Sequence, residues 1–181
     1  DNLLRAIVRK SPLMSFDFTY EQLQIQENVT KLCAEFGDEY WLARDKDEKF
    51  PEDFCKAIAN HGYMGIAIPE AYGGAGLGIT EAAILMQEIS RSGAGNGGVS
   101  SVSLAIFGLN PVVRYGTEEK KARMLPPIIK RANTASFAAS AASPGVATAT
   151  LKRKAIRKNK RHMEHSQKAW NTTAHSPKTA P

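Results

Sequence analysis

The sequence has few of the residues that define several classes of protein. It contains 2 Cys, 9 Pro and 14 Gly among 181 residues, which excludes a disulfide framework, a collagen-like repeat and a low-complexity chain. No apolar run approaches the roughly 20 residues needed to cross a bilayer. Cys33 and Cys55 have no CxxC partner. We therefore expect reduced thiols and a cytoplasmic or other intracellular location, the mitochondrial matrix included.

Positive charge is concentrated at one end of the chain. Residues 1–130 contain 14 basic and 17 acidic residues, a net charge of −3, whereas residues 131–181 contain 10 basic and 1 acidic residue, a net charge of +9. The run 152–161 is typical of a nucleic-acid-binding patch or of a solvated chain end. The charge pattern thus divides the chain into two parts.

Hydrophobic periodicity predicts a helical body up to about residue 130. A first long helix begins at Thr19, which forms a capping-box pattern with Gln22. Its apolar face comprises Ile25, Val29, Leu32, Cys33, Phe36 and Tyr40. Later helices are predicted from Pro51 to Gly62, from Thr80 to Arg91, from Ser100 to Leu109, and from Thr117 to a stop at Pro126-Pro127. We therefore expect an all-α body of about five helices.

Two glycine-rich segments lie between these helices. Residues 62–78 predict an ordered loop that runs close to other backbone. Gly93 to Gly98 satisfies G-x-G-x-x-G, but a helix precedes it instead of the strand that a dinucleotide-binding loop requires. We interpret it as a connection between helices. His162 and His165 have no third metal ligand nearby in the sequence, so we expect surface histidines.

Helical periodicity is lost after about residue 134. Weak β signals favour strands in 135–140, 151–158 and 162–172, with Asn159-Lys160 at a turn. The predicted fold class is mainly α with a small partial β segment (α+β). The chain would then comprise an N-terminal extension (1–15), a helical domain (16–134) and a basic, incomplete β segment (135–181).

Three segments resemble one family in order and spacing. Residues 65–76 read GIAIPEAYGGAG, residues 88–91 read EISR before a glycine-rich stretch, and residues 115–126 read YGTEEKKARMLP. Together they resemble the acyl-CoA dehydrogenases, flavin enzymes that desaturate acyl thioesters between the α and β carbons. The resemblance covers roughly residues 16–135. It implies that 16–134 is the family's N-terminal helical domain and that 135–181 is a partial, divergent middle β domain.

Two further segments resemble the family strands that hold FAD. They are residues 136–146, SFAASAASPGV, and residues 167–172, QKAWNT. The resemblance implies flavin contacts at Phe137, Ala139, Ser140, Gly145, Trp170 and Thr172. These residue types suit the flavin ring, which is flat and aromatic with polar edges. Such a ring binds against an aromatic side chain and accepts or donates a few directed hydrogen bonds. Ala141 and Ala142 stand where the family has Glu-Pro, and Val146 where it has a Ser that contacts the FAD phosphates, so we expect weak or absent FAD binding.

The resemblance also implies an activity and partners. It implies FAD-dependent oxidation of an acyl-CoA substrate in a homo-oligomer. Apart from the resemblance, we expect no membrane span and no nucleic-acid partner. The family's catalytic base lies in a C-terminal helical domain, so we assign no catalytic residue and expect a truncated product that is inactive alone. Two other hypotheses stay open: a non-catalytic module that binds acyl-CoA or a protein, and nucleic-acid binding by the basic tail.

Overall fold

A computed structural model describes residues 17–133 in full and the backbone of residues 155–157 and 163–165. Seven α-helices lie within the described residues, with short 3₁₀ and π turns between some of them. The expectation of a mainly helical body is confirmed, although about five helices were expected. The description below concerns these residues only.

The first described helix, α2 (Tyr20–Cys33), begins where the sequence predicts. The Gln22 N–H donates to Thr19 Oγ1 at 3.2 Å, and the Thr19 N–H donates to Gln22 Oε1 at 3.0 Å, which completes the capping box. The helix buries Ile25, Val29, Leu32 and Cys33. The predicted apolar stripe is therefore correct within this helix.

The stripe does not continue in the same helix, so the predicted single helix to Tyr40 is wrong. Residues 34–37 form a turn, and α3 (Asp38–Lys46) begins after Gly37 in extended conformation. Phe36 and Tyr40 still pack against the same core, and their rings meet edge-to-face at 5.0 Å. Phe36 and Tyr40 therefore share the buried face of α2 because of tertiary packing, although the helix ends before them.

The next helix, α4 (Glu52–Asn60), follows the predicted boundaries closely. Pro51 is its N-cap, and Gly62 follows it with φ of +80°, a conformation that glycine adopts at little cost. Two 3₁₀ turns, Tyr63–Gly65 and Glu70–Tyr72, then lie in the glycine-rich segment.

Two helices joined by a π-helical turn come next. α5 (Ile79–Ile89) leads through the turn Ser90–Ala94 into α6 (Gly95–Ile106). Gly93 has φ of +93°, and a Cβ there would lie 2.6 Å from Asp38 Oδ1. Gly93 and Ala94 thus belong to a tight connection between helices, as predicted. The rest of the G-x-G-x-x-G segment, Gly95–Gly98, is already the first turn of α6, so the predicted helix start at Ser100 is wrong.

The described helical body ends with two helices, of which the first was not predicted. α7 (Asn110–Tyr115) has Pro111 in its first turn, and α8 (Glu118–Ile129) is capped by Thr117, whose Oγ1 accepts from the Lys120 N–H at 3.3 Å. The predicted stop at Pro126-Pro127 is wrong, because α8 continues through both prolines. Its last turn buries Ile128 and Ile129, and this burial offsets the lost backbone hydrogen bonds.

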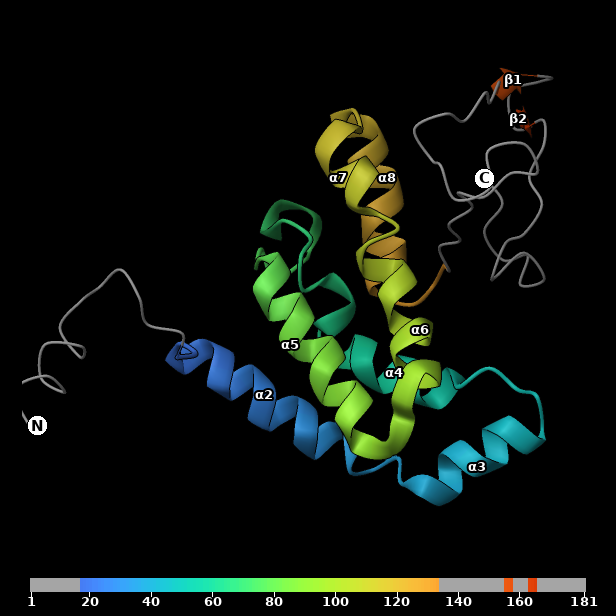
Figure 1. Cartoon of the computed structure of the whole chain (residues 1–181). Helices are drawn as coiled ribbons and strands as arrows, with labels where there is room; N and C mark the ends of the chain where they lie inside the picture. The colour runs from blue at the N-terminus through green and yellow to red at the C-terminus, as the bar shows by residue number, and fades with distance from the viewer. Residues whose placement is uncertain (1–16, 134–154, 158–162, 166–181) are drawn as a thin grey trace, which may run out of the picture.

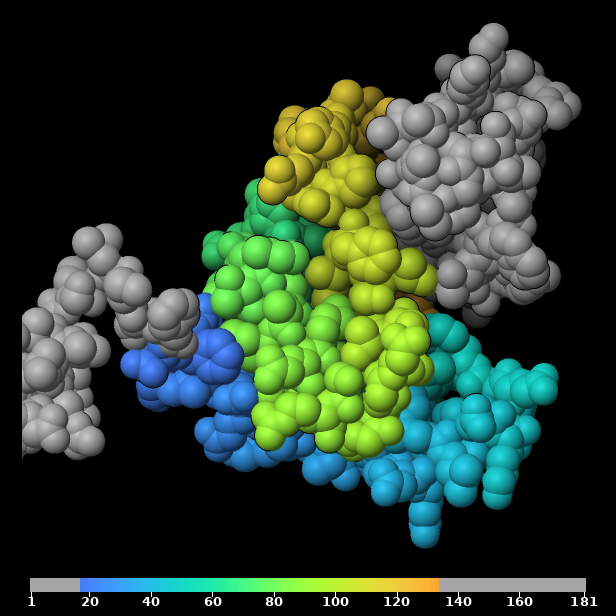
Figure 2. All heavy atoms as spheres, in the orientation of Figure 1, coloured from blue at the N-terminus to red at the C-terminus, as the bar shows by residue number. Residues whose placement is uncertain are grey.

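The described residues contain two hydrophobic clusters. The larger one unites α2, α4, α5 and α6, and α2 lies along α5 (Figure 1). The smaller one joins the glycine-rich segment to α7 and α8 through Ile68, Leu109, Leu125, Ile128 and Ile129. α3 contributes no fully buried residue and forms the cyan corner at the lower right of Figure 2.

Two short strands lie beyond the helical body. β1 (Ala155–Arg157) pairs antiparallel with β2 (Met163–His165), with Ile156 opposite Glu164. Each lies within one of the segments predicted as strands, whereas the predicted strand 135–140 lies outside the described residues. The predicted α+β class therefore agrees with the described elements.

Candidate functional site

The glycine-rich segment 65–78 folds back on itself and packs on α8. The Ala75 N–H donates to the Gly65 carbonyl at 2.9 Å, and the Gly76 N–H donates to the Ile68 carbonyl at 2.8 Å. A Cβ on Gly74 would lie 2.0 Å from the Ile68 carbonyl oxygen, so only glycine fits there. The predicted close approach of backbone to backbone is confirmed.

A polar cluster connects this loop to the start of α8. The Tyr72 hydroxyl donates to Glu118 Oε2, and Lys121 Nζ donates to Glu118 Oε1 at 2.9 Å. The hydrogen bond from Tyr72, followed by that from Lys121, lowers the pKa of Glu118. Tyr72 belongs to segment 65–76, and Glu118 and Lys121 belong to segment 115–126. Both segments resemble the family in sequence, and the structure brings them into contact.

Glu88 is the only charged residue fully buried among the described residues. Gln26 Nε2 donates to its Oε1 at 2.8 Å, the Thr30 hydroxyl lies 3.1 Å from its Oε2, and Arg91 Nη1 lies 3.0 Å from Oε1. Burial alone raises the pKa of Glu88, but the hydrogen bonds from Gln26, Thr30 and Arg91, together with the Arg91 charge, outweigh burial and leave the pKa lowered. The carboxylate therefore stays ionised and joins α5 to α2.

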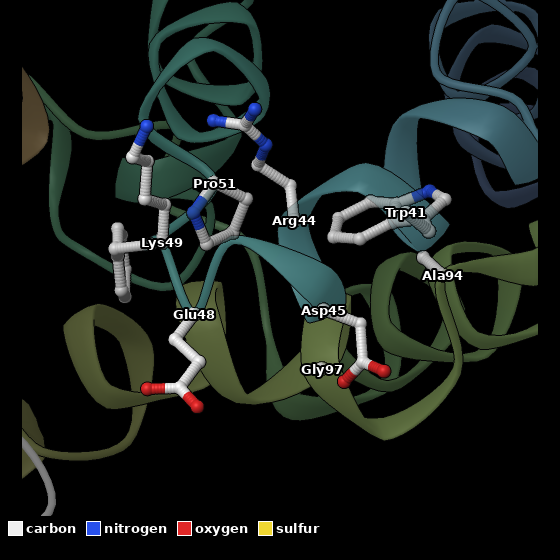
Figure 3. A pocket seen from close by; sticks show the side chains of 9 residues that line it. Trp41, Arg44, Asp45, Glu48, Lys49, Pro51, Ala94 and Gly97 are labelled. Atoms are coloured by element: carbon white, nitrogen blue, oxygen red, sulfur yellow. The ribbon is translucent and has the colours of Figure 1, made fainter.

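A hollow opens between α3 and the start of α6. Its volume is about 650 Å³, and it is lined by Trp41, Arg44, Asp45, Glu48, Lys49, Phe50, Pro51, Ala94 and Gly97. Figure 3 shows the Arg44 and Lys49 cations on one side and the Asp45 and Glu48 carboxylates on the other. Both cations pair with Asp47: Arg44 Nη2 lies 3.3 Å and Lys49 Nζ lies 3.7 Å from Asp47 Oδ2. Nothing in this lining has the arrangement of a catalytic group and its partner.

Metal-binding and membrane-spanning features are absent from the part of the chain that the structure describes. No group of three or more His, Cys, Asp or Glu could hold a metal ion there, and no helix there has the length and apolar character needed to cross a bilayer. Cys33 and Cys55 are free and buried, and burial raises the pKa of both thiols. Both cysteines therefore belong to the helix core.

Comparison with known proteins identifies this arrangement of helices. The family model "Acyl-CoA dehydrogenase, N-terminal domain" matches residues 19–132, which is well over half of the chain. The chain belongs to the acyl-CoA dehydrogenase family. The match contains all three segments on which the resemblance was founded.

Individual relatives agree with the family. An acyl-CoA dehydrogenase of Bacillus subtilis is 33% identical over 154 residues, which cover 85% of this chain and 40% of the relative. A mitochondrial isovaleryl-CoA dehydrogenase of Solanum tuberosum is 32% identical over 171 residues, which cover 93% of this chain and 41% of the relative. The chain thus spans about two-fifths of the length of these curated relatives.

A solved structure confirms the fold. The acyl-CoA dehydrogenase of Bacillus anthracis, complexed with FAD, superposes with a TM-score of 0.74 at 23% identity, covering 88% of this chain and 28% of that one. FAD is therefore a cofactor within the acyl-CoA dehydrogenase family.

The six predicted flavin contacts all lie outside the described residues. They are Phe137, Ala139, Ser140, Gly145, Trp170 and Thr172. The structure tests neither their positions nor the domain boundaries at 15 and 134, so these stay predictions. The described helical body ends at residue 133, four residues before Phe137, the first of these predicted contacts.

Sequence reasoning missed the buried contacts around Glu88 and those of Arg131. Arg131 has φ of +55° directly after α8, and Arg131 Nη2 lies 3.3 Å from Glu52 Oε2. Helical spacing does place Gln26 and Thr30 on one face of α2, but no local signal pairs that face with Glu88. Nothing near Arg131 in the sequence indicates Glu52 as its partner.

Proposed function

We propose that this chain is the flavin-binding, N-terminal part of an FAD-dependent acyl-CoA dehydrogenase that oxidises acyl-CoA thioesters between the α and β carbons. The family match over residues 19–132 carries this proposal. The names of relatives from Bacillus subtilis and Solanum tuberosum support an acyl-CoA thioester as the substrate class. A homo-oligomeric assembly and an intracellular location belong to the same proposal.

The residues proposed to hold FAD have complementary roles. The Trp170 indole and the Phe137 ring would pack against the flavin, and the hydroxyls of Ser140 and Thr172 would hydrogen-bond to its polar edge. Ala139 and Gly145 are small enough to let the ring approach the backbone. FAD supplies the hydride acceptance when it is bound.

Weak binding is part of the proposal, because the segment lacks several polar partners. Val146 offers no hydroxyl to a phosphate, and Ala141 offers no carboxylate. Two lost hydrogen bonds to charged groups, at about 1.5–3 kcal/mol each, correspond to a loss in affinity of about 10²- to 10⁴-fold. We propose that residues 1–181 bind FAD reversibly and do not oxidise acyl-CoA by themselves.

A titration with matched variants tests the flavin contacts. FAD would be added to the 181-residue protein while its absorbance band and fluorescence anisotropy are followed. We expect Thr172→Ala and Ser140→Ala to weaken binding about five- to tenfold, the effect of one neutral hydrogen bond. The controls Thr173→Ala and Ser143→Ala remove a neighbouring hydroxyl that has no proposed role. Equal affinities within each pair would refute the assignment of these contacts.

The same titration separates the other functions considered for this sequence. Binding of acyl-CoA without any FAD binding would favour a non-catalytic binding module. Binding of nucleic acid with a steep dependence on salt would favour a role for the basic tail.

A further inference from the structure

The hollow between α3 and the start of α6 has the size of a small-molecule site. Its volume of about 650 Å³ falls within the range of roughly 300–1,000 Å³ that ligand pockets occupy. Gly97, in the first turn of α6, lines the hollow, and a Cβ built on it would meet nothing within 4 Å beyond its chain neighbours and its own helix backbone. The hollow therefore has room for a ligand over the first turn of α6.

Trp41 gives this hollow a rigid aromatic wall. The Trp41 indole N–H donates to the Phe36 carbonyl at 2.9 Å, and the indole meets the Phe54 ring edge-to-face at 5.0 Å. A Cβ on Gly98 would lie 3.2 Å from Trp41 Cη2, so α6 packs directly against the indole. Phe50, whose side chain also lines the hollow, adds a second and partly exposed ring. An indole held in one orientation loses little conformational freedom when it binds a ligand.

The charges around the hollow are paired on one side and unpaired on the other. Arg44 and Lys49 both form ion pairs with Asp47. The exposed carboxylates of Asp45 and Glu48 line the opposite side (Figure 3) and have neither an ion pair nor a hydrogen bond with any described residue. These three carboxylates and two cations carry a net charge of −1. The charge left without a partner is therefore negative.

A cation with an apolar body complements both the aromatic wall and the unpaired carboxylates. Organic ammonium ions bind over aromatic rings, and the attraction is strongest for tryptophan. A metal ion fits less well, because no group of three or more metal ligands lies within residues 17–133. We propose that this hollow binds a small organic ammonium ion, which packs against Trp41 and Phe50 with its charge beside Asp45 and Glu48. The inference is independent of the proposed flavin function.

The expected affinity is modest. Asp45 and Glu48 are exposed, and ion pairs at exposed sites are individually weak. The partial positive charge at the start of α6 also opposes a bound cation. We therefore expect a dissociation constant in the millimolar range for choline, a small quaternary ammonium ion.

A titration of the 181-residue protein with choline chloride, followed by ¹H–¹⁵N NMR, tests the proposal at Trp41 itself. The chain has 2 Trp, and the variant Trp170→Phe identifies the indole N–H signal of Trp41. We expect choline to shift this signal saturably. The neutral analogue 3,3-dimethyl-1-butanol, which has the shape of choline without its charge, should bind at least about tenfold more weakly. Sodium chloride at the same ionic strength should give no saturable shift.

Matched variants test the two carboxylates. We expect the double variant Asp45→Asn and Glu48→Gln to weaken choline binding at least about fivefold. Glu39→Gln, which removes an exposed carboxylate of α3 outside the lining of the hollow, should keep the parent's affinity. Urea unfolding checks that each variant folds, and Asp45→Asn alone replaces the double variant if that variant does not fold.

Several results would overturn the proposal. One is the absence of any saturable shift of the Trp41 signal with choline, and another is an equal affinity for the neutral alcohol. A folded carboxylate variant that binds choline as tightly as the parent would also contradict it. Saturable binding of inorganic phosphate in place of choline would show that Arg44 and Lys49, and not Asp45 and Glu48, determine the charge of the ligand.

Discussion

Replacing the buried carboxylate of Glu88 should destabilise the helical body measurably. Glu88→Gln keeps the size of the side chain but removes the charge that faces Gln26, Thr30 and Arg91. Breaking a buried ion pair costs about 3–5 kcal/mol, but the Arg91 side chain is 64% exposed and can be solvated instead. We therefore expect Glu88→Gln to lower the free energy of unfolding by about 2 kcal/mol, and Glu88→Ala to lower it by about 3 kcal/mol because all acceptors are lost.

The effect should depend on pH with a defined sign. The pKa of Glu88 lies below its ordinary value of 4.5 in the folded protein. Its contribution to stability is therefore complete above the unfolded pKa and is lost as the pH falls through the folded pKa. The stability difference between the parent and Glu88→Gln should be constant near neutral pH and should shrink in acid.

Urea unfolding followed by circular dichroism at pH 7 and at several acidic pH values measures both effects. Glu119→Gln is the matched control, because Glu119 is exposed on α8 and should change stability by less than about 0.5 kcal/mol. If Glu88→Gln is as stable as Glu119→Gln at pH 7, the account of Glu88 as a link between α2 and α5 is wrong.

Two further substitutions test the backbone geometry. Gly74→Ala should lower the free energy of unfolding by about 3 kcal/mol or prevent folding, because its Cβ would overlap the Ile68 carbonyl. Gly37→Ala, where a Cβ meets nothing within 4 Å, is its control, and equal losses in urea unfolding would contradict the argument. Glu48→Gly should raise the thermal midpoint, since it relieves a positive φ that costs about 1 kcal/mol; a lower midpoint would show that the Glu48 side chain makes a stabilising contact.

Features with local causes could be predicted from the sequence. The capping box at Thr19 and Gln22, the cap at Thr117 and the left-handed glycine at Gly62 each depend on residues within one helical turn. The glycine-rich loop was predictable for the same reason, because only glycine permits such close backbone approach.

Features that depend on distant partners could not be predicted. Gln26 and Glu88 are 62 residues apart, and Arg131 and Glu52 are 79 residues apart. Local rules also failed where packing outweighs them: α8 passes through Pro126 and Pro127 because its last turn is buried against Ile68 and Leu109. For the candidate site, only a resemblance to family motifs was informative, since no local pattern near Trp170 or Ser140 specifies a flavin.

The absorbance spectrum of the purified 181-residue protein, recorded before and after adding FAD and then an acyl-CoA, tests the central claim most directly. We expect a protein that is colourless as purified, that perturbs the flavin band when FAD is added, and that does not bleach that band with acyl-CoA. A flavin spectrum unchanged by the protein would contradict the proposed flavin binding. A stoichiometric yellow protein that acyl-CoA bleaches would contradict the proposed weak binding and lack of activity, and it would require a catalytic base among these 181 residues.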